Sequence, residues 1–333
     1  MPASRRAVLA GSALAGTALA APAFLLGRTA APPAYAAPPA AARQAPAYYR
    51  FRVGSTVLTS VYDGFYARAI DARFVRNASF TDVQRALGEA FMAPDTLEIP
   101  ITPLVVQTSA GLVMIDTGSG GQLGETAGSL PSNLAAAGFD PKAIGTILIS
   151  NFHPDHINGL RTKDNELTFP NAEIRVSQAE WAFWMSEDNF KRAAGDAVTT
   201  TQFLNAKRVF GGLRERVKPF APDQEVAPGI TAIDAPGHTP GHCAFAIASG
   251  KDAFMAMCDI TNHPWLFARH PDWQPRVDMD GPLAVKTRLR LLDRISSDRM
   301  PIQGYHFPFP GYGHIAKSGT GYEFVPAMWQ TAL

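Results

Sequence analysis

The sequence predicts an α/β fold in which two halves, each made of strands and helices, pack together as a sandwich. Three observations support this prediction. Short β-rich runs bounded by turn residues recur along the chain, a helical stretch separates two of them, and a second strand-rich block repeats the theme. No internal repeat and no obvious linker divides the chain, so residues 48–333 are expected to form one domain.

The individual elements follow from local patterns. In the first half, β-branched and aromatic residues between turn residues predict strands at 49–53, 56–62, 102–108, 112–116 and 146–150. A helical pattern around 130–137 ends near Gly138, a residue type that commonly follows the end of a helix. In the second half, strands are expected at 173–176, 230–234, 243–248 and 253–257.

Residues 179–217 have a different character, because this segment reads as helical and carries several aromatic side chains, which are Trp181, Phe183, Trp184, Phe190 and Phe203. We expect these aromatics to pack inward. The alternative is that part of the segment lines a substrate pocket, since concave ligand sites are built mainly from aromatic and apolar side chains.

Composition excludes several classes of protein. The 333 residues include 30 Lys and Arg, 29 Asp and Glu and two Cys, and 46% are hydrophobic. A disulfide-stapled miniprotein, a disordered chain and a basic nucleic-acid-binding protein are therefore excluded. Residues 1–36 carry three arginines and no acid, so 27 basic groups face 29 acidic ones in the remainder. This balance favours neither nucleic acid nor an anionic membrane as a partner.

The first 36 residues are predicted to be a Tat-type signal peptide. A twin arginine, Arg5 and Arg6, precedes an uncharged stretch at 7–26, and the sequence A-Y-A at 34–36 supplies a cleavage site. A retained membrane anchor is the alternative, but a run so rich in Ala and Gly is weakly hydrophobic for a spanning helix. Residues 37–47 form an Ala/Pro-rich spacer. We therefore expect a periplasmic or secreted protein without stable membrane association after cleavage.

The candidate chemistry gathers around a few histidines and aspartates. The apolar strand T-I-L-I-S is followed by N-F-H-P-D-H, which places Asn151, His153, Asp155 and His156 on a strand-to-loop turn. Residues two apart on an extended chain project to the same side, so Asn151 and His153 can converge on one point while the other two turn elsewhere. Imidazole and carboxylate donors at this spacing suit zinc or a similar divalent metal. Further donors follow at later strand ends, and these are His238, Asp259 and His306.

These clusters, taken in order, resemble the metallo-β-lactamase superfamily, whose signature is H-x-H-x-D-H followed by a separate His, an Asp and a last His. The supporting I-D-T-G at 115–118 is also present. The tail Y-H-F-P-F-P-G-Y-G makes the chain similar to the methyl parathion hydrolase group and its lactone- and aryl-ester-hydrolysing relatives. The resemblance implies an αββα sandwich, with Asp116 as an acid that orients a metal ligand. His242 matches a recurrent family position, but we interpret it as structural.

The resemblance also implies two adjacent metal positions. The first would use His153, His238 and a bridging Asp259, together with residue 151. The second would use Asp155, His156, Asp259 and His306. Zinc is the expected metal, in one or two copies, with manganese, cobalt and iron as alternatives.

One position departs from the family pattern, because Asn151 stands where the family has a histidine. An amide oxygen is a neutral and poorer donor than an imidazole. Three hypotheses follow: a working site in which Asn151 is a weak ligand, an enzyme with one metal in the second position, and a catalytically impaired member.

The expected activity is hydrolysis of lactones, aryl esters or phosphotriesters (organophosphates) by a hydroxide that the metal generates. Asp155 would bind the second metal and orient the nucleophile. The alternatives are hydrolysis of β-lactams or of other esters and thioesters, and a non-catalytic metal-binding protein. A small molecule is the expected partner, and a homodimer is possible. Candidate pocket residues are Phe65, Arg76, Trp184 and Phe267.

The two cysteines, Cys243 and Cys258, flank a predicted hairpin whose turn is centred on Gly250 and Lys251. A cross-strand disulfide and two free buried thiols are the alternatives. Bridges between paired strands are strained and Tat substrates fold in a reducing compartment, so free thiols are expected.

Overall fold

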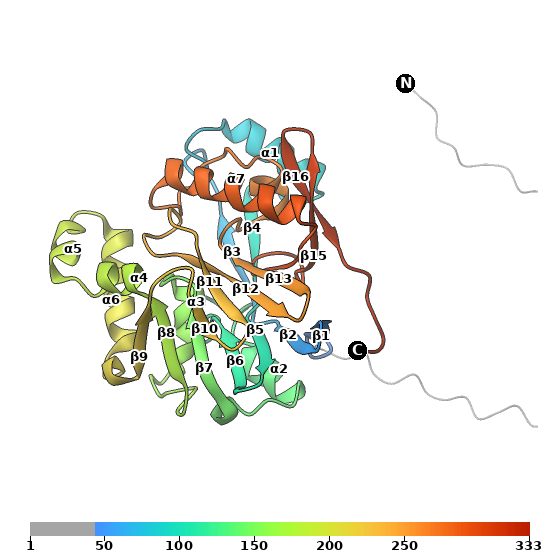
Figure 1. Ribbon diagram of the computed structural model, residues 1–333. Coiled ribbons are helices and arrows are strands. Elements are labelled where there is room, and N and C mark those ends of the chain that lie inside the picture. The colour runs from blue at the N-terminus through green and yellow to red at the C-terminus, as the bar shows by residue number, and fades with distance from the viewer. Residues whose placement is uncertain (1–43) are drawn as a thin grey trace, which may run out of the picture. The chain divides into compact units, whose positions relative to one another are not determined.

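Two seven-stranded β-sheets pack face to face in the computed structural model, which describes residues 44–333 (Figure 1). The first sheet consists, in spatial order, of β1 (Tyr48–Val53), β2 (Thr56–Val61), β5 (Leu104–Thr108), β6 (Gly111–Ile115), β7 (Ile144–Ile149), β8 (Glu173–Ser177) and β9 (Val217–Phe220). The second consists of β10 (Glu225–Ala227), β11 (Ile230–Asp234), β12 (Cys243–Ser249), β13 (Asp252–Cys258), β14 (Pro301–Gly304), β15 (Tyr312–Ser318) and β16 (Gly321–Pro326). A separate hairpin pairs β3 (Gly64–Ala69) with β4 (Thr96–Ile101).

Helices cover the outer faces of both sheets. The helices are α1 (Phe80–Glu89), α2 (Leu130–Ala136), α3 (Pro154–Ile157), α4 (Gln178–Trp184), α5 (Glu187–Arg192), α6 (Ala197–Phe210) and α7 (Gly281–Ser297). One buried cluster joins α2, α4 and α6 to the first sheet, a second lies between the sheets, and a third joins α7 to the second sheet. These three apolar layers define an αββα sandwich, which confirms the predicted fold class.

The predicted helical segment at 179–217 is divided by capping residues. Ser186 and Asp196 cap the starts of α5 and α6 through side-chain bonds to backbone N–H groups, and each cap begins a new helix. The last residue of the prediction is wrong, because Val217 begins β9, which pairs in parallel with β8. The aromatic side chains do pack inward: Trp184 and Phe203 are fully buried, and the other three pack against the same cluster.

The strand directions gather the predicted metal donors at one end of the sandwich. In the first sheet β6 and β7 are parallel. In the second, β11 and β13 run in the same direction because each is antiparallel to β12, and β14 is parallel to β13. Loops that follow the carboxyl ends of these strands therefore meet. Those loops carry residues 116, 151–156, 238, 259 and 306.

The predicted hairpin is confirmed, with Ser249 paired to Asp252 around the turn, and both cysteines are buried and free. Residues 44–333 form one compact unit whose first strand begins at Tyr48. The predicted leader and most of the spacer lie outside the described residues. Within the described residues, every helix is too short or too polar to cross a membrane.

Candidate metal centre

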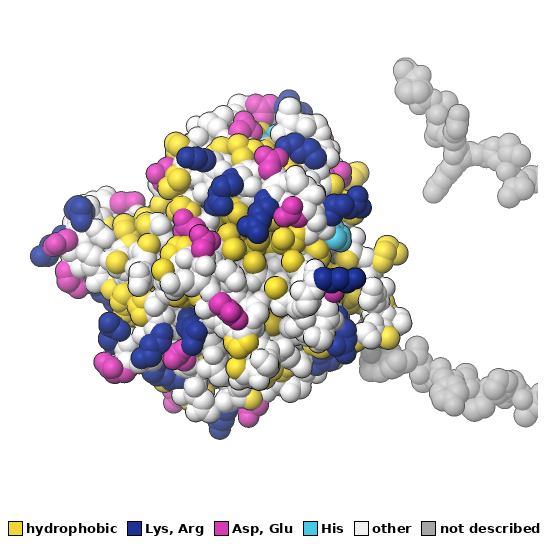
Figure 2. Space-filling view, viewed as in Figure 1, with side chains coloured by type: hydrophobic (Ala, Val, Ile, Leu, Met, Phe, Trp, Pro, Cys, Tyr) yellow, Lys and Arg dark blue, Asp and Glu magenta, His cyan; other side chains and the backbone are white. Residues whose placement is uncertain are grey.

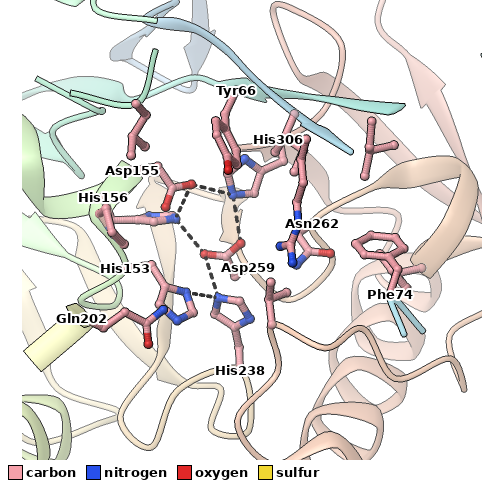
Figure 3. Close-up of a pocket in the computed structure, with 17 residues that line it drawn as sticks. Tyr66, Phe74, His153, Asp155, His156, Gln202, His238, Asp259, Asn262 and His306 are labelled. Atoms are coloured by element: carbon pink, nitrogen blue, oxygen red, sulfur yellow. Dashed lines mark hydrogen bonds and ion pairs between the residues drawn. The ribbon is translucent and has the colours of Figure 1, made fainter. Parts of the chain in front are cut away.

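Histidine and aspartate side chains from four loops converge on Asp259, which lies at the centre of the site (Figure 3). Its Oδ2 lies 2.8 Å from His156 Nε2, and its Oδ1 lies 3.0 Å from His306 Nε2. Asp155 Oδ2 completes this group, at 3.6 Å from His156 Nε2 and 3.4 Å from His306 Nε2. The four side chains that were predicted for the second metal position are therefore brought together.

A second pair of histidines lies on the other side of Asp259. His153 Nδ1 is 2.8 Å from His238 Nε2, and that Nε2 is 3.5 Å from Asp259 Oδ2. His153 caps the start of α3 and Pro154 occupies its first turn, so the chain turns sharply between the two groups of donors. The turn directs His153 toward one position while Asp155 and His156 face the other.

Three of the histidine rings are oriented by an acceptor on their second nitrogen. His156 Nδ1 lies 2.8 Å from Asp116 Oδ2, and His306 Nδ1 lies 2.7 Å from the carbonyl oxygen of Pro100. His238 Nδ1 lies 2.9 Å from Asp278 Oδ1. Each acceptor holds the ring proton on Nδ1 and leaves the Nε2 lone pair directed at the centre. Asp116 was predicted for this role, whereas Asp278 was not.

Asp278 is itself held by a buried ion pair. Arg288, on α7, is nearly fully buried and donates to Asp278 Oδ2 at 2.8 Å. Three further N–H groups of Arg288 donate to the backbone carbonyls of residues 260, 271 and 273. Burial opposes ionisation of Asp278, but the bonds to His238 and Arg288 outweigh it and lower the pKa of this carboxyl. The acid that orients His238 is therefore an anion with both oxygens in use.

Asn151 makes contacts different from those of a metal ligand. Its Nδ2 donates to Asp259 Oδ2 at 2.7 Å and to Ser150 Oγ at 3.2 Å. Its Oδ1 accepts the backbone N–H of His153 at 2.9 Å. The amide is fully buried and does not belong to the pocket wall that the histidines line.

Burial and neighbouring charges set the protonation of the centre. Burial, reinforced by the adjacent His238, lowers the pKa of His153 to about 3. Burial would also lower the pKa of His156, but nearby carboxylates, Asp259 first, hold it well above its usual value. Burial would raise the pKa of Asp259, yet three imidazoles around it keep the pKa well below its usual range. The lowered pKa of Asp259 favours its carboxylate anion and the raised pKa of His156 favours a protonated ring, whereas His153 is neutral.

The donor set fits a divalent metal of the zinc type. Asp155, His156 and His306 offer ligand atoms that all lie within 4.8 Å of one another. Their separations of 3.4 and 3.6 Å from Asp155 are close to the edge of a tetrahedron, about 3.3 Å, built with zinc bonds of about 2.0–2.1 Å. Imidazole and carboxylate ligands, with acceptors behind the rings, are the usual composition of such sites.

A buried glutamate that sequence reasoning missed ties the two histidine loops together. Glu180, on α4, is fully buried. Its Oε1 accepts from the backbone N–H of Phe152 and from Trp184 Nε1, both at 2.8 Å. Its Oε2 accepts from Thr239 Oγ1 at 2.8 Å and from the backbone N–H of Gly241 at 2.9 Å. One carboxylate therefore holds the loop before His153 and the loop after His238.

His242 has the structural role that was predicted for it. Its Nδ1 faces the carbonyl oxygen of Ala235 at 2.8 Å, and its Nε2 accepts the backbone N–H of Asp259 at 3.1 Å. Burial, with the charge of His238 nearby, lowers the pKa of His242 to about 4. The neutral ring fixes the backbone at Asp259 without facing the metal donors.

A cavity of about 250 Å³ opens onto this centre. Its walls are mainly apolar and aromatic and come from β3, β4 and the segments around α1 and α7; they include Tyr66, Phe74, Leu97, Ile99, Leu123, Phe267 and Val277. Polar side chains enter at three points, and these are Arg68, Gln202 and Asn262. The metal donors form the floor, as Figure 3 shows.

Of the four predicted pocket residues, Phe267 lines this cavity and the other three do not. Trp184 is buried in the core and bonded to Glu180, so its prediction is corrected. Arg76 instead donates to the backbone carbonyls of Pro275 and Arg276. Phe65 adjoins the lining residues Tyr66 and Arg68 on β3 but is not itself part of the wall. The β3–β4 hairpin was not predicted, so its contribution could not be found from local patterns.

Comparison with known proteins places this geometry in context. A family model described as the metallo-beta-lactamase superfamily matches residues 98–263. An N-acyl homoserine lactonase from a Bacillus species is 22% identical over 252 residues, which cover 70% of this chain and 88% of the relative. The solved structure of AidC, described as a dizinc quorum-quenching lactonase in complex with a product, is 27% identical with a TM-score of 0.79. That match covers 86% of this chain and 99% of AidC. The hydrolase AbOPH, described as a member of the beta lactamase superfamily, is 26% identical with a TM-score of 0.80 over 86% of this chain and 100% of its own.

Proposed function

Because this chain belongs to the metallo-beta-lactamase superfamily and is a metal-dependent hydrolase of it, we propose that it hydrolyses lactones that carry an apolar acyl chain. Zinc is the proposed metal, and aryl esters and phosphotriesters are proposed as slower substrates. The observation that carries the proposal is an apolar cavity whose floor is the metal centre. Such a cavity places an acyl chain against the walls and the ester carbonyl at the floor. The lactonase relatives support the same substrate class.

The metal-binding residues are proposed to be His153, His238, Asp155, His156 and His306, with Asp259 between the two groups. When bound, a divalent metal lowers the pKa of a water molecule and polarises a carbonyl oxygen. The rings are already oriented by their acceptors, so the protein contributes a donor arrangement that needs little rearrangement to bind the metal.

Asp155 is the proposed proton acceptor. Among the described residues that line the cavity, the acidic ones are Asp155 and Asp259, and Asp155 is the more exposed, at 22% of its side chain. Tyr305 fixes its position, because the hydroxyl donates to the backbone carbonyl of Asp155 at 2.7 Å and the ring stacks on His156. A carboxylate held at the floor can orient the attacking water and accept its proton.

The substrate proposal is tested by assaying zinc-loaded protein against N-acyl homoserine lactones of short, medium and long acyl chains, phenyl acetate, methyl parathion and a chromogenic β-lactam. We expect lactone ring opening to be fastest, to stop on chelation and to return with zinc. Asp155→Asn should lower kcat by about 10²- to 10⁴-fold, the usual contribution of a general base. Asp164→Asn, at an exposed aspartate nine residues further along the chain, is the matched control. Turnover of the β-lactam without opening of any lactone would overturn the proposal.

Export to the periplasm or beyond, a homodimeric state and the absence of a nucleic-acid partner stay predictions. On the face shown in Figure 2, basic and acidic side chains are interspersed with apolar ones, as the near-neutral composition leads one to expect. An interspersed surface lacks the continuous positive area that nucleic acid binding uses.

A further inference from the structure

The residue that departs from the family pattern is held in a defined orientation. Asn151 follows β7 directly, and its Oδ1 accepts the backbone N–H of His153, two residues further on. This local bond is the Asx-turn that asparagine commonly forms. It shapes the loop that carries His153, and it directs the amide oxygen at that backbone N–H.

The other end of the same amide faces the central carboxylate. Nδ2 lies 2.7 Å from Asp259 Oδ2 and donates to it. Exchanging the amide oxygen and nitrogen would set an oxygen against Asp259 Oδ2 and an N–H group against the N–H of His153. Both contacts would be repulsive in a fully buried site, so the two neighbours together determine the orientation.

From these contacts we infer that Asn151 is not a metal ligand but a hydrogen-bond donor that positions Asp259. The inference rests on the proposed metal-dependent function and refines it. The position formed by Asp155, His156, His306 and Asp259 keeps four protein ligands. The position between His153 and His238 keeps only these two rings and a shared oxygen of Asp259.

The two positions therefore differ in affinity. Asp259 Oδ2 already lies close to Asn151 Nδ2 at 2.7 Å and His156 Nε2 at 2.8 Å, whereas His238 Nε2 is 3.5 Å away. A hydrogen bond from Asn151 withdraws electron density from the oxygen that both positions share. The chain should bind one zinc ion tightly and a second one much more weakly, in contrast to the dizinc description of AidC.

A zinc titration of metal-free protein against a chromophoric chelator tests this inference, with thermal unfolding to verify that each variant folds. The wild type should show one tight site and a second site weaker by about 100-fold or more, because the second position lacks an imidazole ligand. Loss of a residue that only supports a ligand already costs up to about 100-fold. Asn151→His should tighten the second site by about tenfold or more, because it supplies the missing imidazole. Asn151→Ala should weaken both sites by a similar factor of up to about 100-fold, because both use Asp259 and both lose the donor that positions it. Asn262→Ala, which removes an asparagine side chain that lines the cavity, is the matched control for both constants.

A weakening of the second site in Asn151→Ala that exceeds the weakening of the tight site by about tenfold or more would identify Asn151 as a ligand and overturn the inference. Two equally tight sites in the wild type would overturn it as well. If Asn151→His does not fold, Asn151→Ala still decides, since it only removes atoms. The titration uses no substrate, so a failure to open lactones would count against the proposed function and leave this result intact.

Discussion

Glu180 offers the most informative single perturbation, because its carboxylate joins the two histidine loops through three hydrogen bonds and accepts a fourth from Trp184 on its own helix. Glu180→Ala removes both acceptor oxygens and with them all four hydrogen bonds. Glu180→Gln keeps Oε1, and with it the bonds from Phe152 and Trp184, but places an NH₂ group against Gly241 N–H. Glu180→Gln thus disturbs only the bonds to the loop after His238, whereas Glu180→Ala also removes those from Phe152 and Trp184.

The expected magnitude follows from these bonds. Four hydrogen bonds of about 0.5–1.5 kcal/mol each predict that Glu180→Ala lowers the free energy of unfolding by about 2–6 kcal/mol. Both variants also remove a buried negative charge, so the difference between them is free of that contribution. We expect this difference to be about 1–3 kcal/mol from the two bonds to Oε1, before any cavity left in the alanine variant. Zinc affinity should fall by about 10- to 100-fold, the usual cost of losing support behind metal ligands.

Urea unfolding of metal-free protein measures the stability change, and a zinc titration measures the affinity. The matched control is Glu187→Ala, whose carboxylate is exposed on α5 and pairs with Lys207 at 2.7 Å. An exposed pair should change stability by no more than about 1 kcal/mol. Unchanged stability and unchanged zinc affinity in Glu180→Ala would refute the assignment of Glu180 as the residue that holds the loops.

The pH dependence gives an independent check on Glu180. Burial raises its pKa above the ordinary value of 4.5, although its four donors oppose the shift. A carboxyl group with a raised pKa binds its proton more tightly in the folded state, so its favourable contribution is present below 4.5 and is lost as pH rises through the folded pKa. The stability difference between wild type and Glu180→Ala should therefore be larger in weak acid than at neutral pH.

Two further predictions concern the support of His238 and the leader. Asp278→Asn should lower zinc affinity by about 10- to 100-fold, because an amide no longer holds the proton of His238 on Nδ1 as firmly. It should also destabilise the fold, because it leaves Arg288 without its counter-ion. Zinc titration measures the first effect and urea unfolding the second. Unchanged values in both measurements would contradict this role. The exported protein should begin after residue 36, and replacing both Arg5 and Arg6 by lysine should retain it in the cytoplasm; amino-terminal sequencing and fractionation check this. A mature chain that keeps residue 1 would contradict cleavage.

The metal donors could be predicted because each one lies in the loop after a buried strand, and parallel strands bring their following loops to the same end of a sheet. The short motif at 151–156 also carries several of the donors within six residues, so their spacing is known from the sequence. The β3–β4 hairpin escaped prediction for the opposite reason. Its two strands pair across 26 intervening residues that include α1, so no local turn signal connects them. The residues of these two strands that line the cavity were therefore not predicted either.

Glu180 and Asp278 show why supporting residues are harder to find than ligands. Each is an acid on a segment without a motif, and its role exists only where several backbones meet. Glu180 receives bonds from residues 28 positions before it and 61 positions after it. Asn151 shows that the role of a residue within the motif also depends on the structure around it. Its residue type indicates that an imidazole is missing, but only the path of the backbone at His153 determines that the amide oxygen turns away and the nitrogen faces Asp259. A sequence motif therefore identifies which side chains can bind a metal, whereas the hydrogen bonds behind them determine how many metals the site holds.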